Sequence, residues 1–356
     1  MSRKIGLDIV RSLAILTVIL GHSSILLQNT ILEGFPYIKP IDGVDLFFVL
    51  SGFLIGGILL REFDQESKLI QILSFWKRRW FRTLPLYFLF LIINYWFISE
   101  NWTRGDINQA TWKFFFFLQN FSTPFYDFFW ESWSLSVEEW FYLMFPMLFY
   151  LGLKFFSKKN AFLLVIVLFI LSTIVFRFNA RTPNINPFIF DITFKKVVLL
   201  RLDSIAYGLL FAWLITYYQS FINRLKFMFL IISVLILVVH RTIELEITSV
   251  FAQVFYYSIS PMALSLCLPF FNSLVLKPSW FSNSFTFISK ISYSMYLINL
   301  SIIIDPIHQN FQNSNGIVAY LVSWTLIIFF SFLLYHFFEK PITNLREVSF
   351  RKFLFN

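Results

Sequence analysis

Apolar segments of about twenty residues recur along the whole chain, and they constrain its fold more than any other feature. A helix needs about 20 apolar residues to cross the hydrocarbon core of a bilayer. We expect ten spans, near residues 5–27, 42–60, 80–99, 132–153, 161–178, 197–219, 227–240, 247–271, 285–305 and 316–338. The pattern predicts an all-α, polytopic integral membrane protein with short loops.

The composition supports this class and excludes two others. Hydrophobic residues make up 58% of the 356 residues and charged residues only 14%, with 50 phenylalanines, which is unlike a soluble domain. An outer-membrane barrel would show short alternating strands, and the chain has none of that alternation. The net charge of +9 comes from short basic segments between the spans. Positive-inside topology explains those segments without a nucleic-acid partner.

The aromatic stretch 111–130 is too short for an additional span and is interrupted by Pro124. We predict a re-entrant or interfacial segment, because such backbone is tolerated where protein buries it. Ten spans then place both termini and the basic clusters, including 77–82, 154–159 and the tail 346–352, in the cytosol. We find no repeat, and we expect one transmembrane domain over 1–356 without an appended extracytoplasmic domain.

The first span carries three residues that lipid disfavours, Asp8, Arg11 and His22. Ionisable groups inside a span normally face protein and have a function. Eleven residues separate Arg11 from His22, which is close to three turns at about 3.6 residues per turn, so both share one face roughly 16 Å apart along the axis. Asp8 joins this face, and a salt bridge to Arg11 that only holds the helix is the alternative interpretation.

Carboxylates occur at the depth of His22 in two other spans. Asp45 lies in the outer part of the second span, and Glu138 and Glu139 lie at the entrance of the fourth. A carboxylate at that level can fix the tautomer of His22 and leave its other nitrogen as a base. For Glu139 an interfacial position without a role is equally open.

A basic stretch with four aromatic residues begins the third span. It contains Arg78, Arg79 and Arg82. Arg79 and Arg82 are three residues apart and can hold one anion between them, and guanidinium forks suit phosphate geometry. Arg11 should lie near the same inner level. The stretch therefore predicts a phosphate-binding site, with positive-inside orientation as the simpler explanation.

Three further polar residues fall in the outer halves of spans. Arg201 and Asp203 lie near the start of the sixth span, where they can pair with each other or contact a hydroxylated substrate. Asn299 lies at a similar depth in the ninth span, close to Tyr293 and Tyr296, for which we expect packing roles.

Taken in order, these segments resemble the membrane-bound acyltransferase 3 family. The matching pieces are Leu7–Arg11 with His22, Gly43–Phe53, Arg79–Pro85 and Trp133–Glu139, and more weakly Arg201–Asp203, Tyr293–Leu297 and Phe338–Pro341. The resemblance implies a ten-helix core that transfers an acyl group, usually acetyl from acetyl-CoA, to an extracytoplasmic glycan or lipid-linked sugar. Trp140, Ser12 and Asn299 depart from the family pattern. Many members have histidine in place of Asn299, which argues against an essential role there.

The residues and the resemblance together give a set of expected sites. Catalytic candidates are His22, Asp45 and Glu138; donor-binding candidates are Arg11, Arg78, Arg79 and Arg82; acceptor-binding candidates are Glu139, Arg201, Asp203 and Asn299. His22 acts either as a base or as an acetyl carrier. We expect acetyl-CoA as donor, no metal, no nucleic acid, a bacterial inner membrane, and an O-antigen, lipopolysaccharide or lipid-linked precursor as acceptor. A transporter or flippase of a glycolipid is the alternative.

Overall fold

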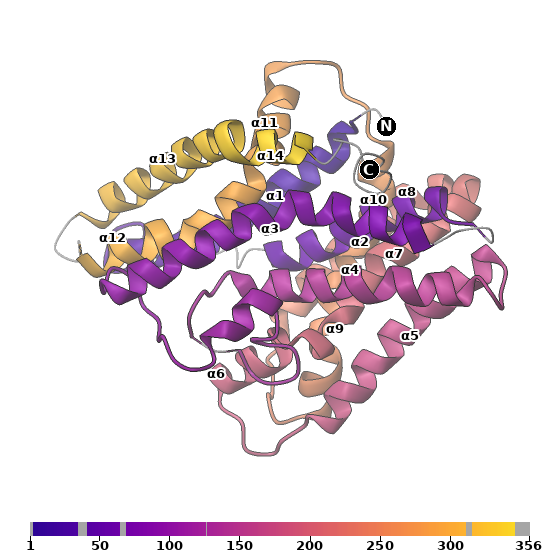
Figure 1. Cartoon of the computed structure of the whole chain (residues 1–356), viewed down its shortest axis with the longest axis horizontal. Coiled ribbons are helices and arrows are strands. Elements are labelled where there is room, and N and C mark those ends of the chain that lie inside the picture. Colours follow the sequence, from indigo (N-terminus) through magenta and orange to yellow (C-terminus); the bar gives the residue numbers. More distant parts are fainter. Residues whose placement is uncertain (1–2, 35–40, 65–68, 126, 311–314, 346–356) are drawn as a thin grey trace, which may run out of the picture.

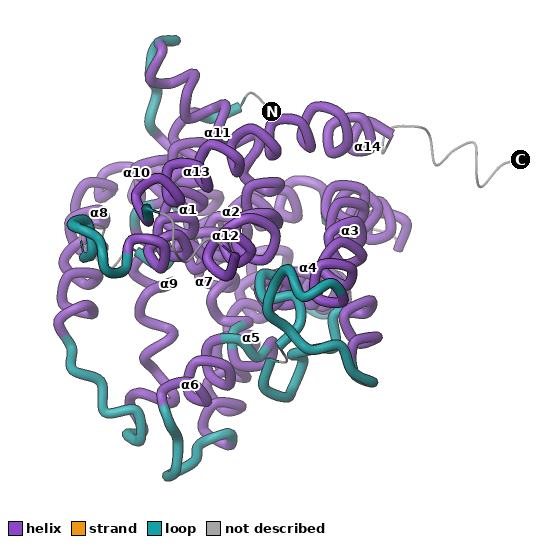
Figure 2. The backbone as a smooth tube through the Cα atoms, turned by 90° about the vertical axis from the view of Figure 1, so that its left-hand side faces the viewer, coloured by secondary structure: helices purple, strands orange, loops and turns teal. Residues whose placement is uncertain are grey.

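The computed structural model describes residues 3–34, 41–64, 69–125, 127–310 and 315–345. The basic tail 346–352, which we expect in the cytosol, lies outside these residues. Within the described residues the secondary structure is entirely helical (Figure 1). Viewed at right angles, the helices are joined by loops and no strand is drawn (Figure 2). The predicted all-α class is therefore confirmed.

Helices occupy all ten predicted spans. Eight are long and apolar enough to cross a membrane: Ile5–Leu27, Gly43–Glu62, Leu69–Ser99, Lys158–Asn179, Gln219–Thr242, Phe251–Ser273, Trp280–Asn310 and Gly316–Leu345. The other two are α4 (Ser132–Gly152) and the shorter α7 (Leu202–Tyr217). The third helix starts at Leu69 rather than near residue 80, because the basic stretch before the apolar core continues as helix.

Several of the long helices contain more than one element. The elements of the bundle, besides α4 and α7, are α1 (Ile5–Ser23), α2 (Gly43–Glu62), α3 (Leu69–Ser99), α5 (Lys158–Asn179), α6 (Pro187–Phe190), α8 (Gln219–Thr242), α9 (Tyr256–Leu266), α10 (Leu268–Ser273), α11 (Trp280–Ile298), α12 (Asp305–Asn310), α13 (Gly316–Leu334) and α14 (Lys340–Leu345). A π-helical turn, Asn299–Ile304, joins α11 to α12. Such turns shift the register of a helix and are frequent at functional sites.

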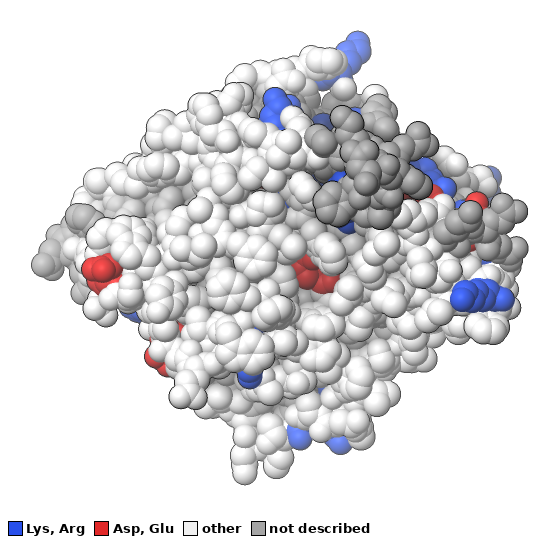
Figure 3. Space-filling model, in the orientation of Figure 1, with Lys and Arg blue, Asp and Glu red and all other residues white. Residues whose placement is uncertain are grey.

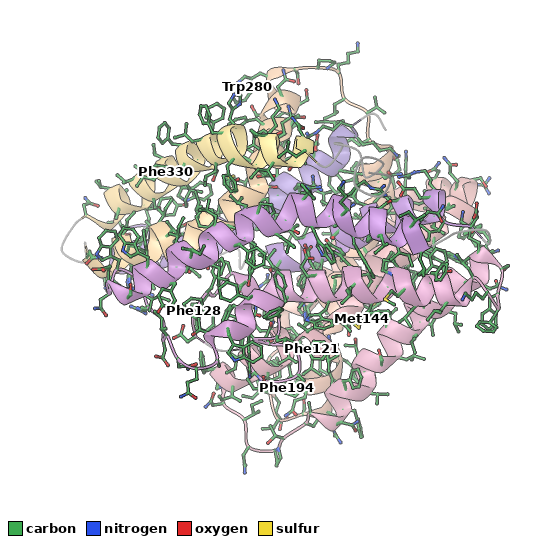
Figure 4. The ribbon with its side chains drawn as sticks, in the orientation of Figure 1. Phe121, Phe128, Met144, Phe194, Trp280 and Phe330 are labelled. Atoms are coloured by element: carbon green, nitrogen blue, oxygen red, sulfur yellow. The ribbon has the colours of Figure 1, made fainter. Side chains whose placement is uncertain are left out.

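The aromatic segment before α4 is not a spanning helix, as predicted. Its regular part is one 3-10 helix, Thr111–Phe116. The segment packs back on the bundle through hydrogen bonds to its carbonyl oxygens, from the Tyr87 hydroxyl to Phe114 at 2.8 Å and from the Trp140 indole to Phe117 at 2.9 Å. Figure 4 labels two of its aromatic residues, Phe121 and Phe128.

The centre of the bundle is built on close backbone contact between α2 and α7. A Cβ added to Gly52 would lie 2.0 Å from the Ile205 carbonyl oxygen, and one added to Gly208 would lie 2.0 Å from the Val49 carbonyl oxygen. Small residues allow this approach in membrane bundles, where van der Waals packing drives helix association. The packing places the first turns of α2 and α7 side by side, next to α1.

The outward faces are apolar. Only 11% of the most apolar window of α8 and 17% of that of the helix at Gly316–Leu345 are buried inside the protein. The face in Figure 3 is largely uncharged, with few acidic and basic side chains. An apolar exterior around helices of this length is what a bilayer requires. The protein is therefore a multi-pass membrane protein.

Candidate functional site

His22, in the last turn of α1, is oriented by an asparagine rather than by a carboxylate. Its Nδ1 lies 2.5 Å from Oδ1 of Asn299, the first residue of the π-helical turn after α11. The Asn299 amide nitrogen donates to the carbonyl oxygens of Met295 and Tyr296, at 3.1 and 2.6 Å. Because the amide nitrogen already donates to two carbonyl oxygens, the amide oxygen is the atom that faces His22.

This arrangement assigns the tautomer of His22 from the hydrogen-bond network. An amide oxygen only accepts, so Nδ1 of a neutral imidazole carries the proton in this contact. The other ring nitrogen, Nε2, then has a free lone pair. A histidine held in this form can accept a proton from a substrate or attack an electrophile.

Three arginines line one narrow cavity, which we call the arginine cavity. Arg11, Arg79 and Arg82 come from α1 and α3 and surround a space of about 100 Å³. Within the described residues none of these three guanidinium groups forms an ion pair. The grouping of Arg11 with Arg79 and Arg82 is what the sequence predicts, and it leaves three positive charges facing the same space.

Asp8 does not neutralise Arg11. Its carboxylate accepts from Arg3 Nε at 2.5 Å and from Ser289 Oγ at 2.8 Å. The alternative interpretation of Arg11, a salt bridge to Asp8, is therefore wrong, and Asp8 instead ties the start of α1 to α11. Arg11 keeps its charge available to the arginine cavity.

Arg78 does not contribute to the arginine cavity. Its guanidinium pairs with Glu62 at the end of α2, and both side chains are partly exposed. It is not among the cavity-lining residues. The structure thus separates Arg78 from Arg79 and Arg82, with which the sequence groups it.

The two adjacent glutamates of α4 point to different places, and neither contacts His22 in this structure. Glu138 lines the arginine cavity together with Arg79 and Arg82. Glu139 is buried and accepts from Thr83 Oγ1 at 2.8 Å, which ties α4 to α3. The expected contact of Glu138 with His22 is wrong because the Glu138 side chain faces the arginine cavity.

A second cavity, the histidine pocket, surrounds His22. It has a volume of about 350 Å³. Its charged and aromatic lining consists of His22, Asp42, Trp130, Glu131, Trp133, Asp191, Lys195, Lys196, Arg241 and Tyr296. Most of these residues lie before a helix or in the segment between α6 and α7, where loops carry polar groups on a rigid scaffold.

Two lysines of the histidine pocket are held by ion pairs. Lys195 Nζ lies 2.9 Å from Asp42, and Lys196 Nζ lies 2.8 Å from Asp191. Burial opposes ionisation of Asp42, but the charge of Lys195 and its hydrogen bond outweigh burial and lower the pKa of Asp42 to about 2. The Lys195–Asp42 pair therefore stays ionised at neutral pH.

Glu131, directly before α4, is a buried carboxyl at the wall of the histidine pocket. Its two oxygens accept from the backbone nitrogen of Ser301 at 2.8 Å and from the Ser301 hydroxyl at 2.6 Å. Burial raises the pKa of Glu131 to about 7, although these hydrogen bonds favour the charged form. The contact joins the start of α4 to the same π-helical turn that carries Asn299.

The arginine cavity and the histidine pocket meet at two residues, Val44 and Tyr296, which line both. The Tyr296 hydroxyl donates to the Glu131 carbonyl oxygen at 3.0 Å. Since that donation uses its only proton, Ser134 Oγ, 2.6 Å away, is the donor in the second contact. Tyr296, expected to be a packing residue, thus stands between the two spaces.

Asp45 belongs to a buried ion pair instead of contacting His22. Its carboxylate pairs with Arg201, whose Nη1 also donates to the Tyr257 carbonyl oxygen at 2.9 Å. Arg201 is 0% exposed and Asp45 only 3%. The expected role of Asp45 as the partner of His22 is wrong, because the approach of α2 to α7 gives it an arginine.

Asp203 completes this buried network on α7. It pairs with Arg177 Nη2 at 2.9 Å and accepts from Ser258 Oγ at 2.5 Å. Neither Arg201 nor Asp203 lines the arginine cavity or the histidine pocket. The expected contact of these two residues with substrate therefore has no support in the geometry. Their ion pairs with Asp45 and Arg177 join α7 to α2 and α5.

Sequence patterns missed several residues of the histidine pocket, above all Lys195, Lys196 and Glu131. One signal was present: two adjacent lysines in a loop assigned to the outside oppose the positive-inside rule. Nothing in the sequence shows that this loop folds back beside His22.

Comparison with known proteins gives the family. Residues 4–336 match the acyltransferase 3 family, described as an acyltransferase domain. A Staphylococcus aureus strain COL protein named "Putative O-acetyltransferase SACOL0978" is 26% identical over 384 residues, which cover 94% of this chain and 56% of that protein. The O-acetyltransferase OatA of S. aureus strain NCTC 8325 is 26% identical over 391 residues, covering 98% and 58%.

The chain spans little more than half the length of these curated relatives. No solved structure matches it. The family match covers nearly the whole chain and includes the residues of both cavities. The chain belongs to the membrane-bound acyltransferase 3 family.

Proposed function

We propose that the protein transfers an acetyl group from acetyl-CoA to a hydroxyl of an extracytoplasmic glycan. The observation that carries the proposal is the meeting of the arginine cavity and the histidine pocket at Val44 and Tyr296. One space presents unpaired guanidinium groups, and the other presents a histidine with a free Nε2. An anionic donor and a hydroxyl acceptor need these two environments next to each other.

The arginine cavity suits the donor. Coenzyme A carries phosphates at one end and a thioester at the end of a linear arm. Arg79 and Arg82, near the start of the apolar part of α3, would bind the phosphates through charge-assisted hydrogen bonds. A cavity of about 100 Å³ has room for a narrow chain and not for a nucleotide, so the arm would enter it past Arg11.

His22 would then act on the acceptor. Nε2 removes the proton of the acceptor hydroxyl as the oxygen attacks the thioester carbonyl carbon. The carbon–sulfur bond breaks, and the coenzyme A thiolate takes back the proton. The products are the acetylated glycan and free coenzyme A. A positioned base of this kind contributes about 10²–10⁴-fold, and orientation of the two substrates supplies further rate.

A covalent route uses the same nitrogen. Nε2 attacks the thioester carbonyl carbon, the carbon–sulfur bond breaks, and coenzyme A leaves as thiolate, which takes a proton from solvent. The acceptor hydroxyl then attacks the acetyl carbonyl carbon, the bond from that carbon to Nε2 breaks, and the hydroxyl proton passes to solvent. Direct transfer needs both substrates bound together, whereas the covalent route predicts ping-pong kinetics. The contact with Asn299 favours a free Nε2 in both routes.

The finer assignments also belong to this proposal. We infer a bacterial inner-membrane location with cytosolic termini and a cytosolic donor face, since basic residues gather at the helix ends near the arginine cavity. The acceptor would be an O-antigen, a lipopolysaccharide or its lipid-linked precursor. A flippase would need a continuous path for a saccharide, and the arginine cavity is too narrow for one.

The test uses the purified chain in proteoliposomes, with acetyl-CoA on one side of the membrane and the acceptor glycan on the other. Mass spectrometry of the glycan should find an added acetyl group. Transport of unmodified glycan without acetylation would contradict the proposal. Surface glycans of cells with and without the protein, compared in the same way, identify the acceptor.

A further inference from the structure

A second space, which we call the lateral cleft, adjoins the histidine pocket. It has a volume of about 770 Å³ and lies between α8 and the starts of α2 and α9. Much of its wall is apolar or aromatic, formed by Val234, Leu237, Val238, His240, Tyr256 and Tyr257. It is larger than the histidine pocket and has no role in the transfer chemistry described above.

The lateral cleft opens on the lipid-facing side of the bundle. Val234 and Val238 line it and are 51% and 57% exposed, so the cleft is open beside α8. Only 11% of the most apolar window of this helix is buried. A long apolar chain can therefore enter the cleft directly from the bilayer.

Four residues, Ile41, Asp42, Lys195 and Arg241, line both the lateral cleft and the histidine pocket, so the two spaces join there. Asp42 and Lys195 neutralise each other in an ion pair of 2.9 Å. Arg241 has no ion-pair partner in the part of the chain that the structure describes. One positive charge thus remains at the junction, on a guanidinium fork that suits phosphate.

His240 forms part of the cleft wall beside Arg241. Its ring stacks on Tyr256 with centroids 4.4 Å apart, and its side chain lines the cleft. The residue is only 8% exposed, and its Nε2 is enclosed by protein and not open to the cleft. Arg241 is therefore the group of this pair that a polar ligand can reach.

We propose that the lateral cleft and the histidine pocket bind an acceptor carried on a long-chain lipid phosphate. The apolar chain lies in the cleft, the phosphate binds at Arg241, and the attached saccharide reaches His22 in the pocket. This inference rests on the proposed function, because only an acyl acceptor needs to lie beside His22. It adds the lipid phosphate as the feature by which the acceptor is recognised.

The test measures binding without any acetyl donor. The full chain in nanodiscs of zwitterionic lipid is titrated with a fluorescent long-chain polyprenyl phosphate. Arg241→Gln should weaken binding about tenfold or more, because charge-assisted hydrogen bonds to the phosphate are lost. Arg224→Gln is the matched control, since Arg224 is also exposed on α8 but near its other end, and its affinity should equal that of the wild type.

A second pair of variants tests the apolar part. Val238 and Val239 are neighbours on α8 and are both 57% exposed, but only Val238 lines the cleft. Val238→Trp should fill the cleft and weaken binding of both the polyprenyl phosphate and its dephosphorylated alcohol. Val239→Trp should leave both affinities unchanged.

Competition experiments separate the possible sources of the phosphate. We expect the polyprenyl phosphate to compete far better than its alcohol, inorganic phosphate or phosphatidylglycerol. Equal competition by any of these three, or wild-type affinity in Arg241→Gln, would overturn the inference. Because the assay contains no acetyl-CoA, a failure of acetyl transfer would appear only in the proteoliposome experiment and would leave this result readable.

Discussion

Nδ1 of His22 and Oδ1 of Asn299 lie 2.5 Å apart and join the end of α1 to the π-helical turn after α11. The contact sets which nitrogen of His22 carries the proton. It places Asn299 beside His22. The sequence interpretation named Asn299 as an acceptor-binding candidate and argued against an essential role there. The amide acts here as the fixed acceptor that orients the imidazole.

We therefore expect Asn299 to be a positioning residue. Asn299→Leu removes the acceptor for Nδ1, so both tautomers and several ring orientations become populated. The kcat for acetyl transfer should fall about ten- to a hundredfold, by analogy with the loss seen when the partners that orient a metal-ligating histidine are removed. The KM for acetyl-CoA should stay unchanged, because the arginine cavity is separate.

A conservative variant shows whether Asn299 orients the His22 ring or only stabilises the fold. Asn299→Asp keeps an accepting oxygen at the same place and should retain clearly more activity than Asn299→Leu. Equal activity of the two variants, or a parallel loss of acetyl-CoA affinity, would show that the contact only supports the fold.

Binding of acetyl-CoA to the arginine cavity should depend on salt. Arg79→Ala combined with Arg82→Ala should raise the Kd for acetyl-CoA at least about tenfold, because charge-assisted contacts are lost. The difference from the wild type should shrink at high ionic strength, where charges are screened. Arg78→Ala is the control, since Arg78 pairs with Glu62 outside the cavity. A loss of affinity in Arg78→Ala as large as in the double variant would argue against the assignment.

The buried network around Asp203 should affect stability and not acceptor affinity. Arg177→Met leaves Asp203 buried without its partner, which typically costs about 3–5 kcal/mol. Arg177→Met together with Asp203→Leu removes both charges and should recover part of the loss. Unfolding in detergent measures these effects, with the exposed Arg181→Met on the same segment as control. If Arg177→Met alone were as stable as Arg181→Met, the Arg177–Asp203 ion pair would not stabilise the fold.

We expect the stability of the folded protein to depend on pH through Glu131. Burial raises the pKa of its carboxyl to about 7, above its ordinary value of 4.5, so the folded state binds the proton more tightly than the unfolded state. The stabilisation of the folded state by the Glu131 proton is complete below about pH 4.5 and is lost as the pH rises through about 7. The melting temperature should fall over this window in the wild type and fall less in Glu131→Gln. The exposed Glu100→Gln should keep the wild-type profile, and a Glu131→Gln profile identical to the wild type would contradict the prediction.

Much of the fold follows from hydropathy and helix geometry. Helices lie at all ten predicted positions, and eight of them are long and apolar enough to cross a membrane. The periodicity of α1 predicts one face for Arg11 and His22, and both residues line cavities in the structure. Depth in the membrane also predicts that Arg11 meets Arg79 and Arg82, since all three lie near the cytosolic ends of their predicted apolar spans.

The partners of individual side chains were not predictable in the same way. Depth alone placed Asp45 beside His22, but the close approach of α2 to α7 brings Arg201 to Asp45 instead. Asn299 reaches His22 in a π-helical turn, where the register differs from that of an ordinary helix. Lys195 ends a short π-helix, Asp191–Lys195, which no periodic pattern in the sequence predicts. When several side chains lie at the same membrane depth, the packing of the helices decides which of them become partners.

Acetyl transfer by His22→Ala in proteoliposomes, measured together with the affinity of this variant for acetyl-CoA, tests the role of His22 most directly. Transfer should fall about 10²–10⁴-fold, the contribution of a positioned base, or more if His22 carries the acetyl group. The affinity for acetyl-CoA should stay unchanged, because the arginines lie in the other cavity. Full acetylation of the glycan by His22→Ala would show that His22 does not carry out the transfer.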